Sequence, residues 1–422
     1  MTNLLWPGDH RAGQLMTDRA LLRSMVAVES AWLNALAAAG LAPPDCAGAD
    51  LSGLLADADS ESVAAGDEGG GNPVLGLVEL LRGRAGPAVG PSIHRGLTSQ
   101  DVVDTALMLG VRAVAEQLRN IIFEQLSALI RHAAAHRSTP MVARTLTQHA
   151  APTTFGAKAA GWLDGVADAA ERLAALPTPI QIGGAAGTLA GATELATLGG
   201  NGERADQLVR AAATALGLDA RPPWHTTRTP VTAAANALVG CTDAWGRIAS
   251  DVVTLVRPEI AELSEPAGDD HRGRSSSMPH KRNPVLSILI RRAAIAAPPL
   301  AATLHTAAAL AHDERPDGAW HAEWDTLRTL ARRTVVAGSQ CAELLGGLVV
   351  HPGRMAENLA TTDVLGEQRA IAGLLGKPPS ATYLGAVDRL VEESVDRARD
   401  VLGRLRSARD ATNDPETRDF RP

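Results

Sequence analysis

Residues 101–136 read DVVDTALMLGVRAVAEQLRNIIFEQLSALIRHAAAH. The apolar residues of this stretch recur at steps of three and four positions: Val103, Leu107, Val111, Val114, Leu118, Ile121 and Ile122. Because an α-helix turns once every 3.6 residues, this spacing places them on one helical stripe. The stretch therefore predicts a single helix far longer than the globular mean of about 11–12 residues.

Four more Ala- and Leu-rich stretches follow, at about 154–176, 230–260, 284–312 and 319–350. Short joints that contain Pro or Gly separate them. Only 3% of the residues are aromatic, so the apolar content is chiefly Ala, Leu and Val. Ala and Leu lose little side-chain freedom in a helix, which favours closely packed helices. The sequence predicts an all-α fold with an elongated central bundle of about five long helices.

The bundle divides the chain into three predicted segments. Residues 1–100 have shorter helical patterns, at 20–40 and 75–82, and predict an N-terminal helical cap. Residues 101–350 form the bundle. Residues 351–422 predict a small C-terminal helical domain, with a helix at about 385–407 and a mobile polar tail from Ser407.

Two long stretches, 173–193 and 293–312, contain no Asp, Glu, Lys or Arg. The first is interrupted by prolines and glycines, and the second by Pro298-Pro299 and two histidines. Neither pattern is typical of a membrane-spanning helix, so we interpret both as buried bundle segments.

The overall charge and the cysteines narrow the class of protein. A net charge of -7 provides no basic surface for nucleic acid. Cys46, Cys241 and Cys341 lie far apart without a CxxC pair, which argues against a disulfide framework and a thiolate zinc site. His321 and Glu323 lack HExxH spacing, so no metal is predicted. The start of the chain lacks a signal-peptide pattern, and we expect a cytoplasmic protein.

The stretch 268–284 reads GDDHRGRSSSMPHKRNP and lies between two predicted long helices. Its Gly and Ser residues permit a mobile loop that closes over a substrate and excludes water. Lys281 and Asn283 would donate to a carboxylate, or to the dianion formed when its alpha proton leaves. A solvated basic loop is the alternative interpretation of these residues.

Residues 275–284, SSSMPHKRNP, resemble the signature GSSxMPxKxNP of the fumarase/aspartase superfamily. This resemblance implies that Ser275 is the catalytic base, that Lys281 takes part in catalysis, and that Ser276, Met278 and Asn283 bind substrate. One position departs from the signature, because Arg274 stands where the family has its leading glycine.

Residues 93–105, IHRGLTSQDVVDT, begin the longest predicted helix. Thr98 and Asp101 have the spacing of a capping box, so helix capping alone would account for them. Amides at a helix start also bind anions, and the two roles are compatible. The stretch resembles the family's H-x-G-x-T-S-x-D region, which implies that Thr98 and Ser99 bind a substrate carboxylate and that His94 is a catalytic residue.

Residues 144–156, RTLTQHAAPTTFG, resemble the family's R-T-H-G-Q-P-A-x-P-T-T region. Leu146 replaces the histidine that adenylosuccinate lyases use in catalysis, which argues against that activity. Gln148 is the retained polar residue and is expected to bind substrate. His149 could compensate for the lost histidine.

Two further stretches, 223–228 (PWHTTR) and 312–324 (HDERPDGAWHAEW), resemble segments of bacterial 3-carboxy-cis,cis-muconate cycloisomerases. They add Arg228 and Arg315 as predicted anion-binding residues. Trp320 and Trp324 lie four positions apart, which favours core packing over ligand contact. The glycine-rich stretch 183–188 lacks a phosphate-loop ending, and close helix approach and substrate contact both remain open for it.

The resemblance implies a cycloisomerase that adds a carboxylate of 3-carboxymuconate across a conjugated double bond while Ser275 returns a proton. In the reverse direction a carboxylate leaves, and its conjugate acid has a pKa of about 4, so Leu146 is tolerable in place of an acid. We expect a polycarboxylate substrate, no cofactor and, by family, a homotetramer whose sites combine three chains. Two alternatives stay open: a lyase of the same superfamily acting on an aspartate-like or nitro-substituted succinate, and a catalytically silent structural relative.

Overall fold

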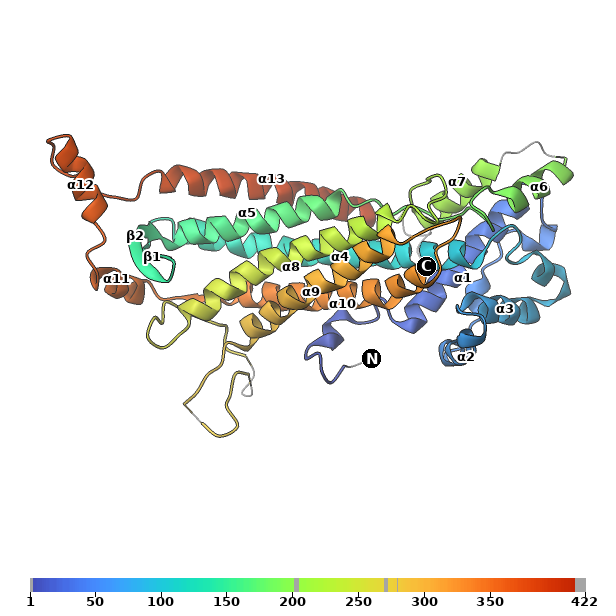
Figure 1. The fold of residues 1–422 in the computed structure, drawn as a ribbon, viewed down its shortest axis with the longest axis horizontal. Coiled ribbons are helices and arrows are strands. Elements are labelled where there is room, and N and C mark those ends of the chain that lie inside the picture. The colour runs from blue at the N-terminus through green and yellow to red at the C-terminus, as the bar shows by residue number, and fades with distance from the viewer. Residues whose placement is uncertain (1–2, 201–204, 269–271, 279, 414–422) are drawn as a thin grey trace.

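The computed structural model describes residues 3–200, 205–268, 272–278 and 280–413. Long, roughly parallel helices run the length of an elongated molecule (Figure 1). This arrangement confirms the predicted all-α bundle. The five predicted bundle helices are α4 (Ser99–Ala135), α5 (Phe155–Ala174), α8 (Thr229–Leu255), α9 (Val285–Ala309) and α10 (Gly318–Gly346).

The packing order of the bundle follows from its helix contacts. Helix α9 packs against α8 and α10, and α4 packs against α5 and α10. A sixth long helix, α13 (Val387–Asn413), lies along α5 and α4. It continues beyond the predicted end at residue 407, and residues 414–422 of the predicted tail lie outside the described residues. The segment boundaries at residues 100 and 350 stay predictions.

Shorter helices cover the end of the bundle where α4 begins (Figure 1). Helix α1 packs against both α4 and α7, so the first hundred residues are fastened to the start of the longest helix. The helices at this end are α1 (Asp18–Ala38), α2 (Asp59–Gly66), α3 (Val74–Val89), α6 (Ala190–Leu198) and α7 (Ala205–Leu216).

The opposite end of the bundle carries the described strands. Strands β1 (Pro140–Thr145) and β2 (Gln148–Thr154) form an antiparallel hairpin with an irregularity between Val142 and Arg144. Strands β3 (Leu263–Ser264) and β4 (Val349–Val350) form a second small pair. Helix α11 (Pro352–Ala360) packs on β1, and α12 (Gly366–Leu374) extends away from the bundle (Figure 1).

Side-chain caps fix where three helices begin. The Thr17 hydroxyl accepts from the amide of Ala20 at 3.2 Å, and the Thr154 hydroxyl accepts from the amide of Ala157 at 3.1 Å. At α4 the carboxylate of Asp101 accepts from the amide of Thr98 at 3.0 Å. Such caps satisfy amides that have no partner within the helix. The capping-box prediction for α4 is confirmed.

The two uncharged stretches have different structures. Residues 175–189 form an irregular connection between α5 and α6 that is buried at its centre, with Ile180 and Ile182 inaccessible to solvent. The second stretch belongs mostly to α9. Among the described helices, α9 alone is long and apolar enough to cross a membrane by length and composition, which is weak evidence because core helices meet the same criteria. One face of it is open, with Ile295 71% exposed.

Candidate active site

The beginning of α4 brings Thr98, Ser99 and Arg315 together. The guanidinium of Arg315 donates to the hydroxyl of Thr98 and, at 3.4 Å, to the carbonyl oxygen of Ala185. Ser99 is the first residue of α4. A cation, a hydroxyl and the free amides of a helix start are therefore adjacent, and this combination suits a carboxylate group.

Buried Asp101 fastens the glycine-rich stretch beneath this cluster. Its carboxylate accepts from the amides of Gly183 (2.8 Å) and Gly184 (2.9 Å) and from the side chain of Gln181 (3.1 Å). His225, also buried, donates to it from Nε2 at 3.0 Å. The sequence indicated Asp101 only as a cap. Its role as the anchor of residues 183–184 has no separate signal in the chain, because the partners are 80–124 positions away.

Gly96 lets the chain before Thr98 approach α6 closely. The residue has φ +80°, and a Cβ built on it would lie 3.2 Å from the amide nitrogen of Ala192. Only glycine adopts this conformation readily. His94, two residues earlier, therefore lies in the same part of the molecule as Thr98, with its Nδ1 2.6 Å from Glu29 Oε1.

Arg228 occupies a buried ion-pair cluster, in contrast to the predicted substrate contact. Its side chain is fully buried and donates to Asp104 at 2.7 and 3.0 Å and to Glu323. Trp320 donates to the same Asp104 at 2.9 Å. The guanidinium is enclosed by Asp104, Glu323 and Trp224, so the prediction that Arg228 contacts substrate is wrong: the fold uses its charge internally.

Burial and the neighbouring charges change the pKa values of the groups in this cluster. Burial lowers the pKa of Arg228, but the charge and hydrogen bonds of Asp104 and Glu323 outweigh burial and raise it above its ordinary value. Burial raises the pKa of Glu323, and hydrogen bonding to Arg228 opposes this only in part. Burial therefore opposes ionisation of Glu323 in a cluster that holds two carboxyl groups and one guanidinium.

The serine loop follows β3 at the far end of α8 and leads into α9. The hydroxyl oxygen of Ser275 accepts from the amides of Met278 (3.2 Å) and Ser277 (3.4 Å). Ser275 is partly exposed, whereas Ser276, Met278 and Lys281 are exposed. Two amides aimed at one oxygen stabilise negative charge on it, so Ser275 differs chemically from the other serines of the loop.

Asn283 closes the neck of this loop. Its backbone amide and its side-chain amide both donate to the carbonyl oxygen of Gly273, at 2.8 and 3.1 Å. A cavity of about 550 Å³ lies at the neck and is lined by Asn283, Arg272, Arg282 and Glu265. The predicted loop residues thus lie beyond one hydrogen-bonded neck, with guanidinium groups at its base.

The hairpin β1–β2 carries the third predicted segment. Leu146 is 96% exposed and Gln148 is exposed at the tip, where the side chain of Gln148 donates to the hydroxyl of Thr147 at 3.2 Å. His149 bonds to the hydroxyl of Thr362 at 2.9 Å. Within one chain this segment contacts no other predicted site residue in the described part of the protein.

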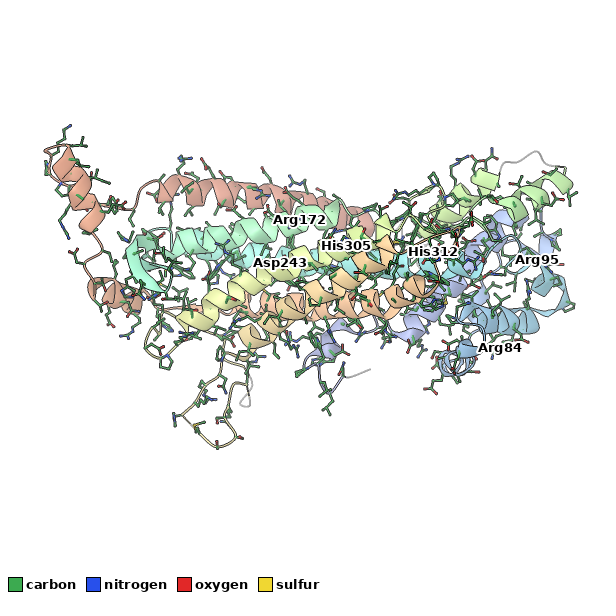
Figure 2. All side chains as sticks on the ribbon, in the orientation of Figure 1. Arg84, Arg95, Arg172, Asp243, His305 and His312 are labelled. Carbon is green, nitrogen blue, oxygen red and sulfur yellow. The ribbon has the colours of Figure 1, made fainter. Side chains whose placement is uncertain are left out.

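Within one chain, the segment of Thr98 lies far from the serine loop and from the β1–β2 hairpin. Helix α4 has 37 residues and separates Thr98 from the hairpin, a length of about 55 Å at 1.5 Å per residue. Helix α8 begins beside Arg228, near the start of α4, and ends toward the serine loop. Figure 2 shows side chains along the whole bundle between these two ends. The predicted site residues therefore lie in two groups at opposite ends of the molecule, which we call the candidate half-sites.

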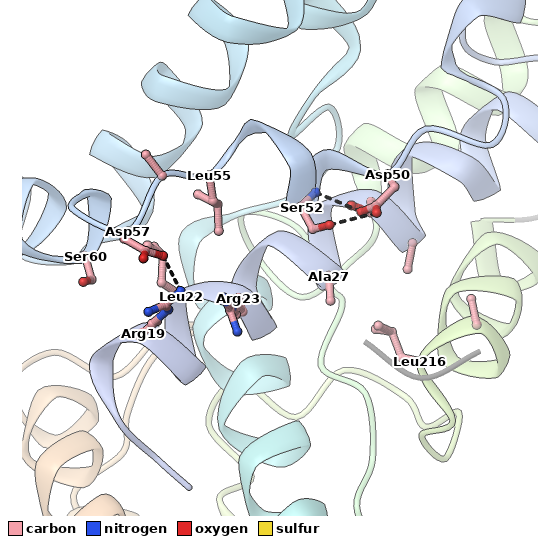
Figure 3. Close-up of a pocket in the computed structure, with 14 residues that line it drawn as sticks. Arg19, Leu22, Arg23, Ala27, Asp50, Ser52, Leu55, Asp57, Ser60 and Leu216 are labelled. Carbon is pink, nitrogen blue, oxygen red and sulfur yellow. Dashed lines mark hydrogen bonds and ion pairs between the residues drawn. The ribbon is translucent and has the colours of Figure 1, made fainter. Parts of the chain in front are cut away.

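Another cavity, of about 510 Å³, lies in the N-terminal segment between α1, residues 50–60 and the end of α7 (Figure 3). An ion pair between Arg19 and Asp57 crosses its edge. No predicted site residue lines it, so this cavity is separate from both half-sites.

Comparison with known proteins links this architecture to one group of enzymes. A family model described as Lyase matches residues 13–297. The nitrosuccinate lyase of Streptomyces davaonensis is 43% identical over 408 residues, covering 94% of this chain and 85% of that protein. The 3-carboxy-cis,cis-muconate cycloisomerase of Bradyrhizobium diazoefficiens is 37% identical over 399 residues, covering 91% and 86%. The crystal structure of the 3-carboxy-cis,cis-muconate lactonizing enzyme from Pseudomonas putida has a TM-score of 0.76 and 30% identity, covering 97% of this chain and 89% of that one.

Proposed function

Since the chain belongs to the fumarase/aspartase superfamily of lyases, we propose that it moves a proton at the carbon next to a carboxylate, with Ser275 as the base. The pair of amides that donate to the Ser275 oxygen carries this proposal. An alcohol becomes a base only where its alkoxide is stabilised, and preorganised amides supply that stabilisation. Lys281 and Asn283 stand on the same loop and stabilise the dianion that forms when the proton leaves.

The leaving group of this reaction is a weak base. Leu146 provides no acidic group where the family has a histidine, and its side chain is almost fully exposed. A carboxylate or a nitrite leaves without being protonated, because each spreads its negative charge over two oxygens. Amine or alcohol leaving groups need an acid to protonate them. The presence of Leu146 therefore favours a carboxylate or nitrite leaving group.

Nitrosuccinate is the first substrate that we propose. The identity of 43% to a nitrosuccinate lyase exceeds the 37% to a cycloisomerase over a similar length. In the elimination Ser275 takes the proton beside one carboxylate, the C–H electron pair forms the double bond, and the C–N bond breaks. Nitrite departs with the electron pair of the broken C–N bond, and an unsaturated four-carbon dicarboxylate remains. Thr98, Ser99 and Arg315 bind the second carboxylate.

Cycloisomerisation of 3-carboxy-cis,cis-muconate is the second candidate. The segments 223–228 and 312–324 favour it, because they resemble cycloisomerase segments and include Arg315 at the anion cluster. Here a carboxylate oxygen of the substrate adds to the conjugated double bond and Ser275 returns a proton to the adjacent carbon. The two reactions share the base and the anion-binding groups. They differ in the substrate, so assays with each substrate distinguish them.

A complete site requires more than one copy of the chain. The half-sites lie at opposite ends of one protomer, and α9 has an open apolar face with Ile288 and Ile295 exposed. We propose that copies associate through this face, as in the tetramers of the family. The serine loop of one copy then meets the Thr98 and Arg315 cluster of another.

Purified protein supplied with each substrate tests the reaction. Nitrite release is measured by diazo coupling, and muconate loss by ultraviolet absorbance. Ser275→Ala should lower kcat by about 10²–10⁴-fold, the range of a positioned general base. Ser277→Ala is the matched control, because it changes a serine of the same loop whose hydroxyl makes no bond in the described residues. Wild-type protein inert toward both substrates would contradict the proposed substrates, and equal loss in both variants would contradict the choice of Ser275.

Mixed assemblies test the shared site. Ser275→Ala and Arg315→Ala proteins, each inactive alone, are unfolded and refolded together. Partial return of activity is expected, because some sites then receive an intact serine loop from one copy and an intact Arg315 from another. Activity that stays absent in mixtures of confirmed oligomers would show that each site is built from one chain.

A further inference from the structure

The turn that carries His94 is held from several sides. His94 has φ +63°, a left-handed conformation that is uncommon outside glycine and frequent at functional sites. Arg82 of α3 donates to the carbonyl oxygen of Ile93 at 2.8 Å. Trp32 of α1 donates to the carbonyl oxygen of Arg95 at 2.6 Å. The carbonyl groups of the residues before and after His94 are therefore held by long side chains from the N-terminal helices.

Glu29 fixes the ring of His94 in the same way. Its Oε1 lies 2.6 Å from His94 Nδ1, and the carboxylate is fully buried on α1, one turn before Trp32. Because a carboxylate only accepts hydrogen bonds, the proton of this contact belongs to Nδ1. The other ring nitrogen, Nε2, has no hydrogen bond within the described residues, and the side chain is 17% exposed.

The burial of Glu29 does not favour folding. Its second oxygen, Oε2, is buried without a hydrogen-bond partner in the described part of the chain. A buried acceptor left unpaired opposes folding, and an apolar side chain of similar size would fill the same space without that penalty. A buried acid that is poorly satisfied, yet aimed at a partly exposed histidine, points to a role in the site.

The turn adjoins the anion-binding cluster. Thr98, which contacts Arg315, follows His94 by four residues, and Gly96 packs on α6 between them. The His94 ring, whose Nε2 has no hydrogen bond in the described residues, therefore lies at the same end of the molecule as Thr98 and Arg315.

We propose that Glu29 is a positioning residue that acts through His94. It holds the imidazole in one orientation and one tautomer, so that Nε2 is presented to the bound polycarboxylate. This inference rests on the proposed function, because it concerns the same site. It adds a residue that lies 65 positions before the motif residue it controls.

A double-mutant cycle on kcat/KM tests the proposal with Glu29→Leu, His94→Asn and the combined variant. Glu29→Leu should lower kcat/KM by about tenfold to hundredfold, as loss of a carboxylate behind a functional histidine does at metal sites. Glu29→Gln keeps an acceptor and should recover part of this loss. In the His94→Asn background the Glu29 substitutions should have no further effect on kcat/KM, because the imidazole through which Glu29 acts is absent.

Equal effects of Glu29→Leu in both backgrounds would overturn the proposal, since a structural role does not depend on His94. Asp59→Asn is the matched control: Asp59 is a buried acid of the same end that pairs with Arg84 and contacts no predicted site residue. It should leave kcat/KM unchanged.

Crystal structures of the wild-type and Glu29→Leu proteins supply a readout that is independent of turnover. The His94 ring should lose its single orientation in the variant, and Glu29→Gln should retain it. A ring that stays in place without any partner at position 29 would overturn the positioning role. An inert wild-type enzyme would contradict the proposed substrates while this structural comparison still decides the role of Glu29.

Discussion

Single residues show how the fold selects among groups of similar chemistry. Arg315 and Arg228 are both cations of the cycloisomerase-like segments, yet Arg315 reaches Thr98 and Arg228 is enclosed by Asp104 and Glu323. A buried guanidinium between two carboxylates is held by electrostatic attraction in a region of low dielectric. Arg228 is therefore committed to ion pairs at the α4 start, whereas Arg315 stays available for the recognition that we propose.

Replacement of Arg228 should be strongly destabilising. Arg228→Met leaves two buried carboxylates without their cation, and we expect the free energy of unfolding to fall by about 3–5 kcal/mol. Urea unfolding at a fixed protein concentration measures this. Arg389→Met removes an exposed ion pair with Glu393 and should cost under about 1 kcal/mol. A loss of similar small size for Arg228→Met would contradict the structural role assigned to the cluster.

At the scale of elements, the serine loop depends on its neck. Gly273 has φ +71°, and a Cβ there would lie 2.6 Å from the carbonyl oxygen of Asn283, which is backbone and has no room to yield. The neck fixes the position from which Ser275 and Lys281 are presented.

Gly273→Ala should therefore damage catalysis more than stability. We expect kcat/KM to fall by at least about tenfold, because small misplacements of reacting groups are costly. Gly376→Ala is the control, since Gly376 has φ +61° and no atom within 4 Å of its Cβ position. Both variants carry the cost of a left-handed alanine, about 1–2 kcal/mol, which thermal unfolding measures. Equal activity of the two variants would show that the neck does not control the loop.

The end of α4 contains a pair of titrating side chains, His132 and His136, whose rings stack 6.4 Å apart. Burial lowers the pKa of His132, although its hydrogen bond to the carbonyl oxygen of Leu345 opposes the change. Burial and the charge of His132 lower the pKa of His136. The unfolded chain, with histidine pKa values of about 6.5, therefore binds protons before the folded one does as the pH falls.

Stability should accordingly decrease below about pH 6.5, where the unfolded histidines become protonated. The slope is at most about 1.4 kcal/mol per pH unit for each histidine. His132→Gln keeps a donor for Leu345 and removes one titrating group, so the unfolding free energy measured from pH 7.5 to about 5.5 should vary less. An unchanged pH dependence in this variant would contradict the role of His132.

The whole molecule is an elongated bundle (Figure 1), and the predicted site residues form one candidate half-site at each end. The proposed association of copies along the bundle would cover the open apolar face of α9 and join the two candidate half-sites.

Ile295→Glu should weaken this association. Ile295 is 71% exposed in one chain, and burial of an isoleucine side chain contributes about 1.5–3 kcal/mol per copy. Light scattering should show smaller assemblies, with unchanged helical circular dichroism and lost activity. Leu4→Glu is the control, because Leu4 is similarly exposed but lies outside α9. Unchanged assembly size in Ile295→Glu would place the contact between copies elsewhere.

The sequence alone determined the helical architecture, because a 3.6-residue repeat of Ala, Leu and Val defines a helix and its buried face without reference to the rest of the chain. It also indicated the three segments with site chemistry, because their residues are contiguous. Only the tertiary structure decided that Arg228 is buried, that Asp101 anchors residues 183–184 and that Glu29 meets His94. These contacts join positions 65–124 residues apart, and such pairings arise from packing between helices, for which no local pattern exists.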